Sequence, residues 1–130
     1  PIRAASIAWI TPASAGESSA SFRRLFCTGE PLPTALCREW ETLTTAPLHA
    51  LYGPTEAAVD VSWYPACGAE LAAVDGNSIP IGYPLWHTGL RILDAHIQPV
   101  PPGVAAHLYL TGTHPALGHL GRPAPPARPF

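Results

Sequence analysis

Hydrophobic residues in this chain fall into short runs that end at glycine or proline. The run Arg24–Thr28 ends at Gly29, and the run Pro47–Tyr52 ends at Gly53-Pro54. Short apolar runs bounded by such residues are typical of buried strands followed by turns. The pattern therefore predicts two short strands.

A helix is predicted between these strands, over Leu32–Leu43. Leu36, Trp40 and Leu43 recur at intervals of four and three, which places them on one helical face. The helix is expected to end near Thr44. A strand, a helix and a strand joined by connections this short predict parallel strands with a crossover helix.

The second half of the chain has a different pattern. Residues 66–78 are small and polar and predict a surface connection. The runs Leu90–Asp94 and His107–Thr111 alternate between apolar and polar positions around a proline-rich turn at Gln98–Gly103. Alternation on both sides of a turn predicts an antiparallel pair of strands.

Together these elements predict the α/β fold class. We expect a partial parallel sheet with a crossover helix over residues 1–65, and antiparallel strands of a barrel-like subdomain over residues 79–112. Helical spacing at Pro1–Ile10 indicates a further helix, and residues 122–130, with four prolines, predict an irregular tail. The 130 residues allow one domain at most.

Composition excludes several classes of protein. Seventeen prolines argue against a protein of long helices. A net charge of −2 and the lack of an extended basic patch argue against nucleic acid as a partner. No apolar run approaches the length needed to span a membrane. Three cysteines without CxxC spacing indicate reduced thiols in a cytoplasmic protein.

Candidate chemistry gathers in Tyr52–Glu56. Glycine lets the backbone approach a ligand, the threonine hydroxyl can donate to a phosphate oxygen, and the glutamate is a hard oxygen ligand suited to Mg²⁺. Since ligands of parallel sheets bind beyond the carboxyl ends of the strands, Thr28–Glu30 and Tyr52–Glu56 are expected to line one crevice. The same residue pattern also occurs in plain turns that open a helix.

Several segments in order resemble motifs of the adenylation domains of nonribosomal peptide synthetases, within the adenylate-forming superfamily. Tyr52–Glu56 resembles the YGPTE motif, Phe26–Leu32 the segment before it and Ile79–Pro84 the PIGxP segment. Thr88–Asp94 and Leu108–Gly112 resemble the strands that follow. The likeness is closest to serine-activating modules, such as those of siderophore biosynthesis.

The resemblance implies a two-step reaction. ATP and an amino acid, here L-serine or a similar small one, give an aminoacyl adenylate, which passes to the phosphopantetheine thiol of a carrier domain. Carrier and condensation domains would be neighbours in the parent protein. Thr55 and Glu56 would be catalytic, with Glu56 holding Mg²⁺. The implied nucleotide-binding residues are Gly29, Glu30, Tyr52, Gly53 and Thr55.

The resemblance also implies a substrate pocket. Its residues would be Phe26, Thr28, Leu51, Val59 and Asp60. Thr28 stands where the family usually has serine, so one methyl group is added to the pocket. Ala50 stands where the family usually has an asparagine that binds the adenine edge. The added methyl group is expected to change selectivity by about 1–3 kcal/mol, enough to blur serine against a similar amino acid. The missing asparagine is expected to cost adenine binding about 0.5–1.5 kcal/mol.

We expect the chain to be one incomplete adenylation domain that is inactive by itself. All seven basic residues are arginine, so the chain holds no lysine to stabilise an adenylate. Two alternatives stay open: a degenerate module that acts as a docking or structural surface, and a piece of another adenylate-forming ligase such as an acyl-CoA synthetase.

Overall fold

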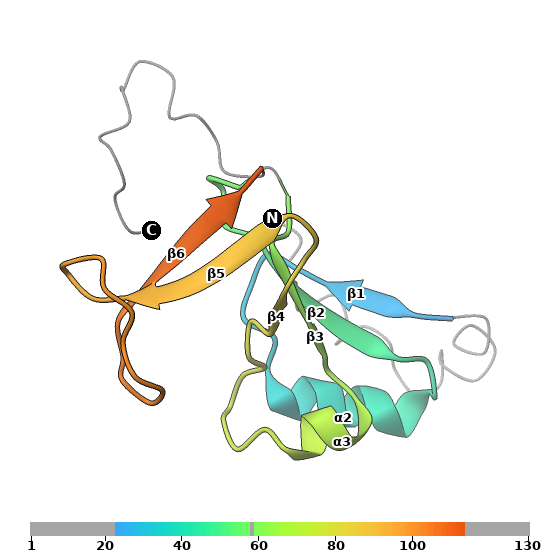
Figure 1. Cartoon of the computed structure of the whole chain (residues 1–130). Coiled ribbons are helices and arrows are strands. Elements are labelled where there is room, and N and C mark those ends of the chain that lie inside the picture. The colour runs from blue at the N-terminus through green and yellow to red at the C-terminus, as the bar shows by residue number, and fades with distance from the viewer. Residues whose placement is uncertain (1–22, 58, 114–130) are drawn as a thin grey trace.

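A four-stranded mixed sheet is the main element of this computed structural model, which describes residues 23–57 and 59–113 (Figure 1). Its strand order is β1-β2-β3-β4, with β1 parallel to β2 and the other pairs antiparallel. The bounds are β1 Leu25–Cys27, β2 Leu48–Tyr52, β3 Ser62–Pro65 and β4 Tyr83–Pro84. The predicted mixed α/β fold class is confirmed.

The crossover helix α2 spans Thr34–Leu43 and connects the two parallel strands, as the sequence predicts. It begins directly after Pro33, whose fixed φ and missing N–H suit a helix start. The helix ends at Leu43, as predicted. Thr44 caps this end, because its N–H donates a hydrogen bond to the Trp40 carbonyl.

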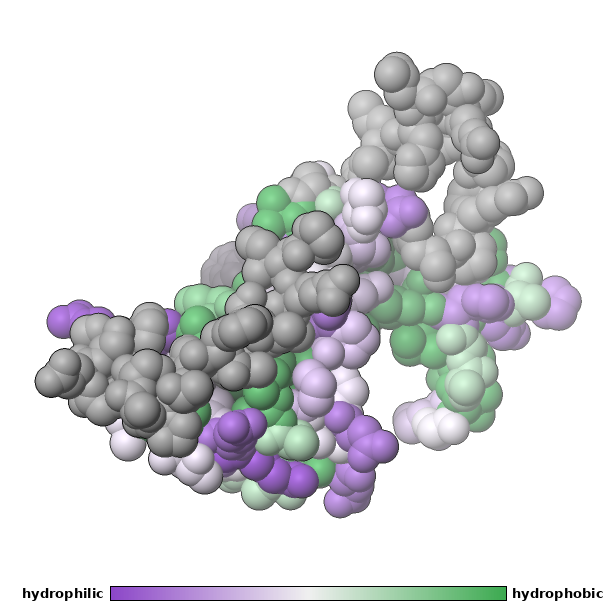
Figure 2. Space-filling view, turned by 180° about the vertical axis from the view of Figure 1, so that it is seen from behind, coloured by the Kyte–Doolittle hydropathy of each residue, from purple (hydrophilic) through white to green (hydrophobic). Residues whose placement is uncertain are grey.

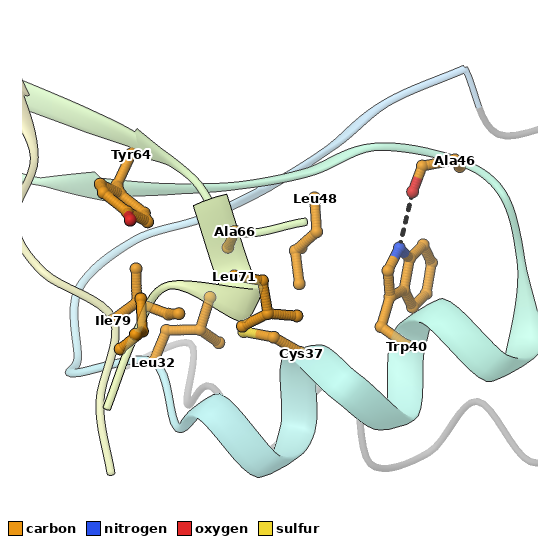
Figure 3. Close-up of a cluster of buried hydrophobic side chains, with 10 residues drawn as sticks. Leu32, Cys37, Trp40, Ala46, Leu48, Tyr64, Ala66, Leu71 and Ile79 are labelled. Carbon is orange, nitrogen blue, oxygen red and sulfur yellow. Dashed lines mark hydrogen bonds between the residues drawn. The ribbon is translucent and has the colours of Figure 1, made fainter. Parts of the chain in front are cut away.

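The core lies between the sheet and two helices that cover one of its faces (Figure 3). Trp40 is buried there, and its indole N–H donates a 2.8 Å hydrogen bond to the Ala46 carbonyl, so the polar atom is satisfied. The buried residues of this cluster are Leu32, Cys37, Trp40, Ala46, Leu48, Tyr64, Ala66, Leu71, Val74 and Ile79.

The second covering helix corrects the sequence interpretation. Residues 66–78, expected to be a surface connection, contain α3 (Gly68–Ala72), and Leu71 is buried in the core. Five residues are too few to show helical periodicity. A distant contact supports the start of α3, because the Gly68 N–H donates a 2.6 Å hydrogen bond to the Glu41 carboxylate on α2.

The antiparallel pair predicted in the second half is confirmed. It consists of β5 (Thr88–Leu93) and β6 (His107–Gly112), with Leu90 opposite Leu110, and it extends away from the four-stranded sheet (Figure 1). The boundary between the two regions lies later than expected, because β4 pairs with β3 rather than with this hairpin. A strand of two residues has no alternation from which to predict its partner.

Two sequence predictions fall outside the described residues, namely the helix at Pro1–Ile10 and the irregular tail at 122–130. Within residues 23–57 and 59–113, no helix is long and apolar enough to cross a bilayer.

Candidate nucleotide-binding crevice

The carboxyl ends of the two parallel strands open into one crevice of about 520 Å³. This volume lies within the range of roughly 300–1,000 Å³ typical of small-molecule sites. The crevice is lined by Gly29, Glu30, Pro31, Leu32, Ala50, Leu51, Tyr52, Gly53, Pro54, Thr55, Ser78, Ile79, Pro80 and Ile81. A crevice between the two strand ends is therefore present, but Thr28 and Glu56, which were also expected to line it, are not among its lining residues.

Local backbone geometry explains the glycines in this wall. A Cβ at Gly53 would collide with the backbone carbonyl of Val59, because the loop after β2 folds back on its own start. The Val61 N–H closes that loop by donating a 2.6 Å hydrogen bond to the Tyr52 carbonyl. Gly29 has a φ of 95°, which other residues adopt only with strain.

The residues expected to bind nucleotide are brought together here. All five of them line the crevice, namely Gly29, Glu30, Tyr52, Gly53 and Thr55. Glu56 follows Thr55 in the same turn and is half-buried, but it does not belong to the crevice lining. The turn is closed by the Ala57 N–H, which donates a 2.9 Å hydrogen bond to the Pro54 carbonyl.

The residues expected to line the substrate pocket do not all line the crevice. Leu51 lines the crevice. The Thr28 hydroxyl donates a 2.5 Å hydrogen bond to the Asp60 carboxylate. Phe26 lies against the ring of His49, and Val59 is 74% exposed. The described residues therefore bring Thr28 and Asp60 into contact, while Phe26 and Val59 contribute no wall to the crevice.

One wall of the crevice was not predicted. Ser78–Ile81 line it from the segment before β4. This segment is fixed by two hydrogen bonds: the Ile79 N–H donates to the Leu32 carbonyl at 2.9 Å, and the Ser62 hydroxyl donates to the Ile81 carbonyl at 2.6 Å. The sequence did indicate that Ile79–Pro84 resembles a family motif, but this resemblance did not assign the segment to the wall of the crevice.

His49 is a second residue that the sequence did not point to. Its ring lies 5.4 Å from the Phe26 ring and 5.8 Å from the Trp63 ring, measured between centroids. Both ring nitrogens are buried, and neither has a hydrogen-bond partner among the described residues. Burial, and secondarily the charge of Arg24, lower the pKa of His49, so the neutral ring is favoured.

Comparison with known proteins decides the family. The model of the AMP-binding enzyme family matches residues 5–120. The chain belongs to the AMP-binding enzyme family. Within it, the chain is 67% identical over 120 residues to enterobactin synthase component F of Escherichia coli K12. That match covers 92% of this chain and 9% of the enterobactin synthase component, so the chain spans a small part of this relative.

Two further comparisons support the placement of the chain in this family. The chain is 49% identical over 104 residues to the vanchrobactin synthetase VabF of Vibrio anguillarum, covering 80% of this chain and 4% of VabF. A four-domain nonribosomal peptide synthetase, AB3403, bound to AMP and glycine, matches in structure with a TM-score of 0.66 and 28% identity over 86% of this chain and 8% of that one. The predicted likeness to adenylation domains of nonribosomal peptide synthetases is confirmed.

The carboxylates near the crevice are too few to hold Mg²⁺ by themselves, but they could hold it together with the phosphates of a bound nucleotide. In the described part of the chain, no group of three or more histidine, cysteine or acidic side chains could hold a metal ion. Glu56 and Glu30 nevertheless supply hard carboxylate oxygens in or beside the crevice. Mg²⁺ is commonly bound by one or two carboxylates together with substrate phosphates, so this donor set fits a nucleotide-bound ion.

Proposed function

We propose that this chain forms the nucleotide-facing part of a domain that adenylates L-serine or a similar small amino acid. The amino acid carboxylate attacks the α-phosphorus of ATP, the bond to the β-phosphate oxygen breaks, and pyrophosphate leaves. The aminoacyl group then passes from AMP to the phosphopantetheine thiol of a carrier domain, with a condensation domain as a further neighbour. We expect this reaction in the cytoplasm, which supplies ATP.

The observation that carries the proposal is the convergence of Gly29, Glu30 and Tyr52–Thr55 on one crevice. Parallel strands bind ligands beyond their carboxyl ends, and this crevice lies at that edge. The Tyr52 ring offers a flat apolar face to adenine, and the Thr55 hydroxyl can donate to a phosphate oxygen.

Glu56 is the residue we assign to Mg²⁺. Bound there, the ion would neutralise charge on the phosphates and help pyrophosphate to leave. Glu56 directly follows Thr55, which lines the crevice, so we expect its carboxylate to act from beside the crevice on the same bound nucleotide. Glu30 lines the crevice after the end of β1 and would bound the site there.

The test is amino-acid-dependent exchange of labelled pyrophosphate into ATP. It uses the full polypeptide encoded by the reading frame that contains these 130 residues. We expect exchange with L-serine, and a loss of at least a hundredfold in kcat/KM for Glu56→Gln, which keeps the size of the side chain but removes its charge. Glu39→Gln, on the exposed side of α2, is the control and should leave exchange unchanged.

Two other outcomes would replace this proposal. Adenylate formation with aryl or fatty acids but not amino acids would indicate an acyl-CoA synthetase. Absence of exchange with every carboxylate would indicate a non-catalytic docking or structural module. For the 130 residues expressed alone we predict no exchange, because a chain without lysine lacks part of the positive charge that phosphoryl chemistry requires.

A further inference from the structure

The crevice shares part of its lining with the hydrophobic core. Leu32 and Ile79 line the crevice and also belong to the buried cluster, and Ala50 of β2 lines the crevice and packs against that cluster. Figure 3 shows Leu32 and Ile79 next to each other, and the Ile79 N–H donates a 2.9 Å hydrogen bond to the Leu32 carbonyl. A ligand that reaches these three residues, which we call the crevice floor, therefore meets alkyl side chains.

Several backbone groups of the crevice floor are already used by hydrogen bonds within the protein. The Leu32 carbonyl accepts both the Ile79 N–H and, at 3.3 Å, the Ser78 hydroxyl. Ala50 lies in β2 between β1 and β3 and has a partner residue on each, so its N–H and carbonyl are directed along the sheet. These groups are therefore not offered to the edge of a bound molecule.

Prolines reduce the number of donors around the crevice further. Pro31, Pro54 and Pro80 all line it, and proline has no N–H to donate. The Pro54 carbonyl already accepts a 2.9 Å hydrogen bond from the Ala57 N–H. The lining side chains that carry polar atoms come from outside the crevice floor, namely Glu30, Tyr52, Thr55 and Ser78.

This division of the lining fits the two ends of a nucleotide. A triphosphate would lose its hydration against alkyl groups, whereas the face of a nucleobase can lie on them. Ala50 and Tyr52 are two residues apart in β2, so their side chains are on the same face of the sheet. The Tyr52 ring and the crevice floor can therefore contact one flat ring system.

We propose that the nucleobase lies on the crevice floor beside the Tyr52 ring, and that the site recognises the base by its flat shape and not by hydrogen bonds to its edge. This inference rests on the proposed function, and it widens the nucleotide substrate of that function from ATP to purine nucleoside triphosphates. It concerns the 6-amino group of adenine above all, because that group lies on the edge of the base.

The experiment compares ATP with purine riboside triphosphate, which has the same ring system but a hydrogen atom in place of the 6-amino group. A site built to bind a substrate N–H rejects an analogue that lacks it by about 10⁴–10⁵. Exchange of labelled pyrophosphate into each nucleotide is measured in the full polypeptide that contains this chain, with whichever amino acid supports exchange into ATP. Equilibrium dialysis gives the dissociation constant of each nucleotide without any turnover.

Three variants accompany the wild type. Ala50→Asn places an amide on the crevice floor, and Ala50→Leu adds a side chain of similar size without a polar atom. Ala72→Asn is the matched control, because it makes the same substitution at an exposed position of α3 that does not line the crevice.

We expect kcat/KM for the two nucleotides to differ by less than tenfold in the wild type. Ala50→Asn should raise the preference for ATP at least threefold, because the amide oxygen can accept a hydrogen bond from the 6-amino group. Ala50→Leu should lower kcat/KM for both nucleotides by a similar factor, since it narrows the crevice without binding the edge of the base. Ala72→Asn should change neither value.

Each contrary result has a distinct meaning. A wild-type preference for ATP of tenfold or more overturns the inference and leaves the proposed function intact. Equal effects of Ala50→Asn and Ala50→Leu on the preference overturn the placement of the base on the crevice floor. Absence of exchange with every nucleotide and amino acid overturns the proposed function. The dissociation constants then decide the inference, which stands only if the two nucleotides bind within tenfold of each other.

Discussion

The two faces of the four-stranded sheet differ in what covers them. On the side of α2 and α3, Leu48 and Cys37 are fully buried and pack around Trp40. The opposite face carries a row of rings, in which Phe26 and Trp63 flank His49 and Phe26 is 54% exposed. Because successive residues of a strand point to opposite faces, Leu25–Cys27 and Leu48–Tyr52 supply both surfaces at once.

The division has a functional meaning under the proposed function. The helix-covered face supplies the packing that fixes the two parallel strands. The other face and the strand ends carry the residues with predicted roles, including Phe26, Thr28 and Leu51. Apolar side chains also reach the surface elsewhere (Figure 2). The exposed ones include Val59 and Trp86. Stability and chemistry are thus expected to depend on different side chains of the same strands.

Leu48→Ala is the strongest test of this division. Leu48 is fully buried at the start of β2, so its truncation leaves a cavity under α2. We expect a loss of about 2–5 kcal/mol in the free energy of unfolding, by analogy with buried leucines in other proteins. Urea denaturation followed by tryptophan fluorescence measures this change.

Phe26→Ala is the counterpart on the open face. Phe26 stacks on His49 but keeps about half of its surface in water. We expect this larger truncation to cost only about 1 kcal/mol, because the area that it removes from burial is smaller. Equal losses for the two variants would show that both faces contribute alike and would contradict the division.

The reactivity of the buried Cys37 thiol tests how well α2 and α3 cover their face of the sheet. Burial first, then the charges of neighbouring groups, raise the pKa of Cys37 from 9.0 to about 11. At pH 8 the reactive thiolate is then about a hundredfold rarer than in a thiol of pKa 9.0. We expect iodoacetamide to alkylate Cys37 much more slowly than the half-exposed Cys67, as peptide mass spectrometry would show.

Denaturant provides the control for this labelling. In 8 M urea all three cysteines should react at similar rates, because burial is lost. If Cys37 reacted as fast as Cys67 in the native protein, the result would show that α2 and α3 do not keep water and reagent away from the core.

The contrast between local and distant contacts explains how far the sequence was informative. The unit β1-α2-β2 was predicted because its signals are local: an apolar run, a helical spacing and a glycine at each strand end. By contrast, the start of α3 is held by a hydrogen bond to the Glu41 carboxylate, and β4 is placed by pairing with Ser62 and Trp63 of β3. Neither partner is indicated by the residues of the element itself.

The same distinction holds for the candidate site. The crevice followed from two adjacent strand ends, so the residues on both could be named beforehand. The wall at Ser78–Ile81 could not, because its place depends on hydrogen bonds to Leu32 and Ser62. The spacing along the chain did not indicate the bond between Thr28 and Asp60 either; only the family resemblance, which named both residues in one pocket, indicated that they lie close together.

The smallest expected effect concerns His49, at the centre of the aromatic face. Its ring is buried without a hydrogen-bond partner among the described residues, and its pKa lies below the usual 6.5. The unfolded chain therefore binds a proton at a higher pH than the folded chain does. As the pH falls through 6.5, the free energy of unfolding should decrease, until the lower pKa of the folded state is reached.

His49→Phe isolates this contribution from that of the other titrating groups. The variant keeps an aromatic ring between Phe26 and Trp63 but binds no proton. We expect the loss of stability between pH 7.5 and pH 5.5, measured by urea denaturation, to be smaller in the variant than in the wild type. Equal losses would mean that the ring meets water in solution, and the aromatic face would then be more open around β2 than the contacts of His49 indicate.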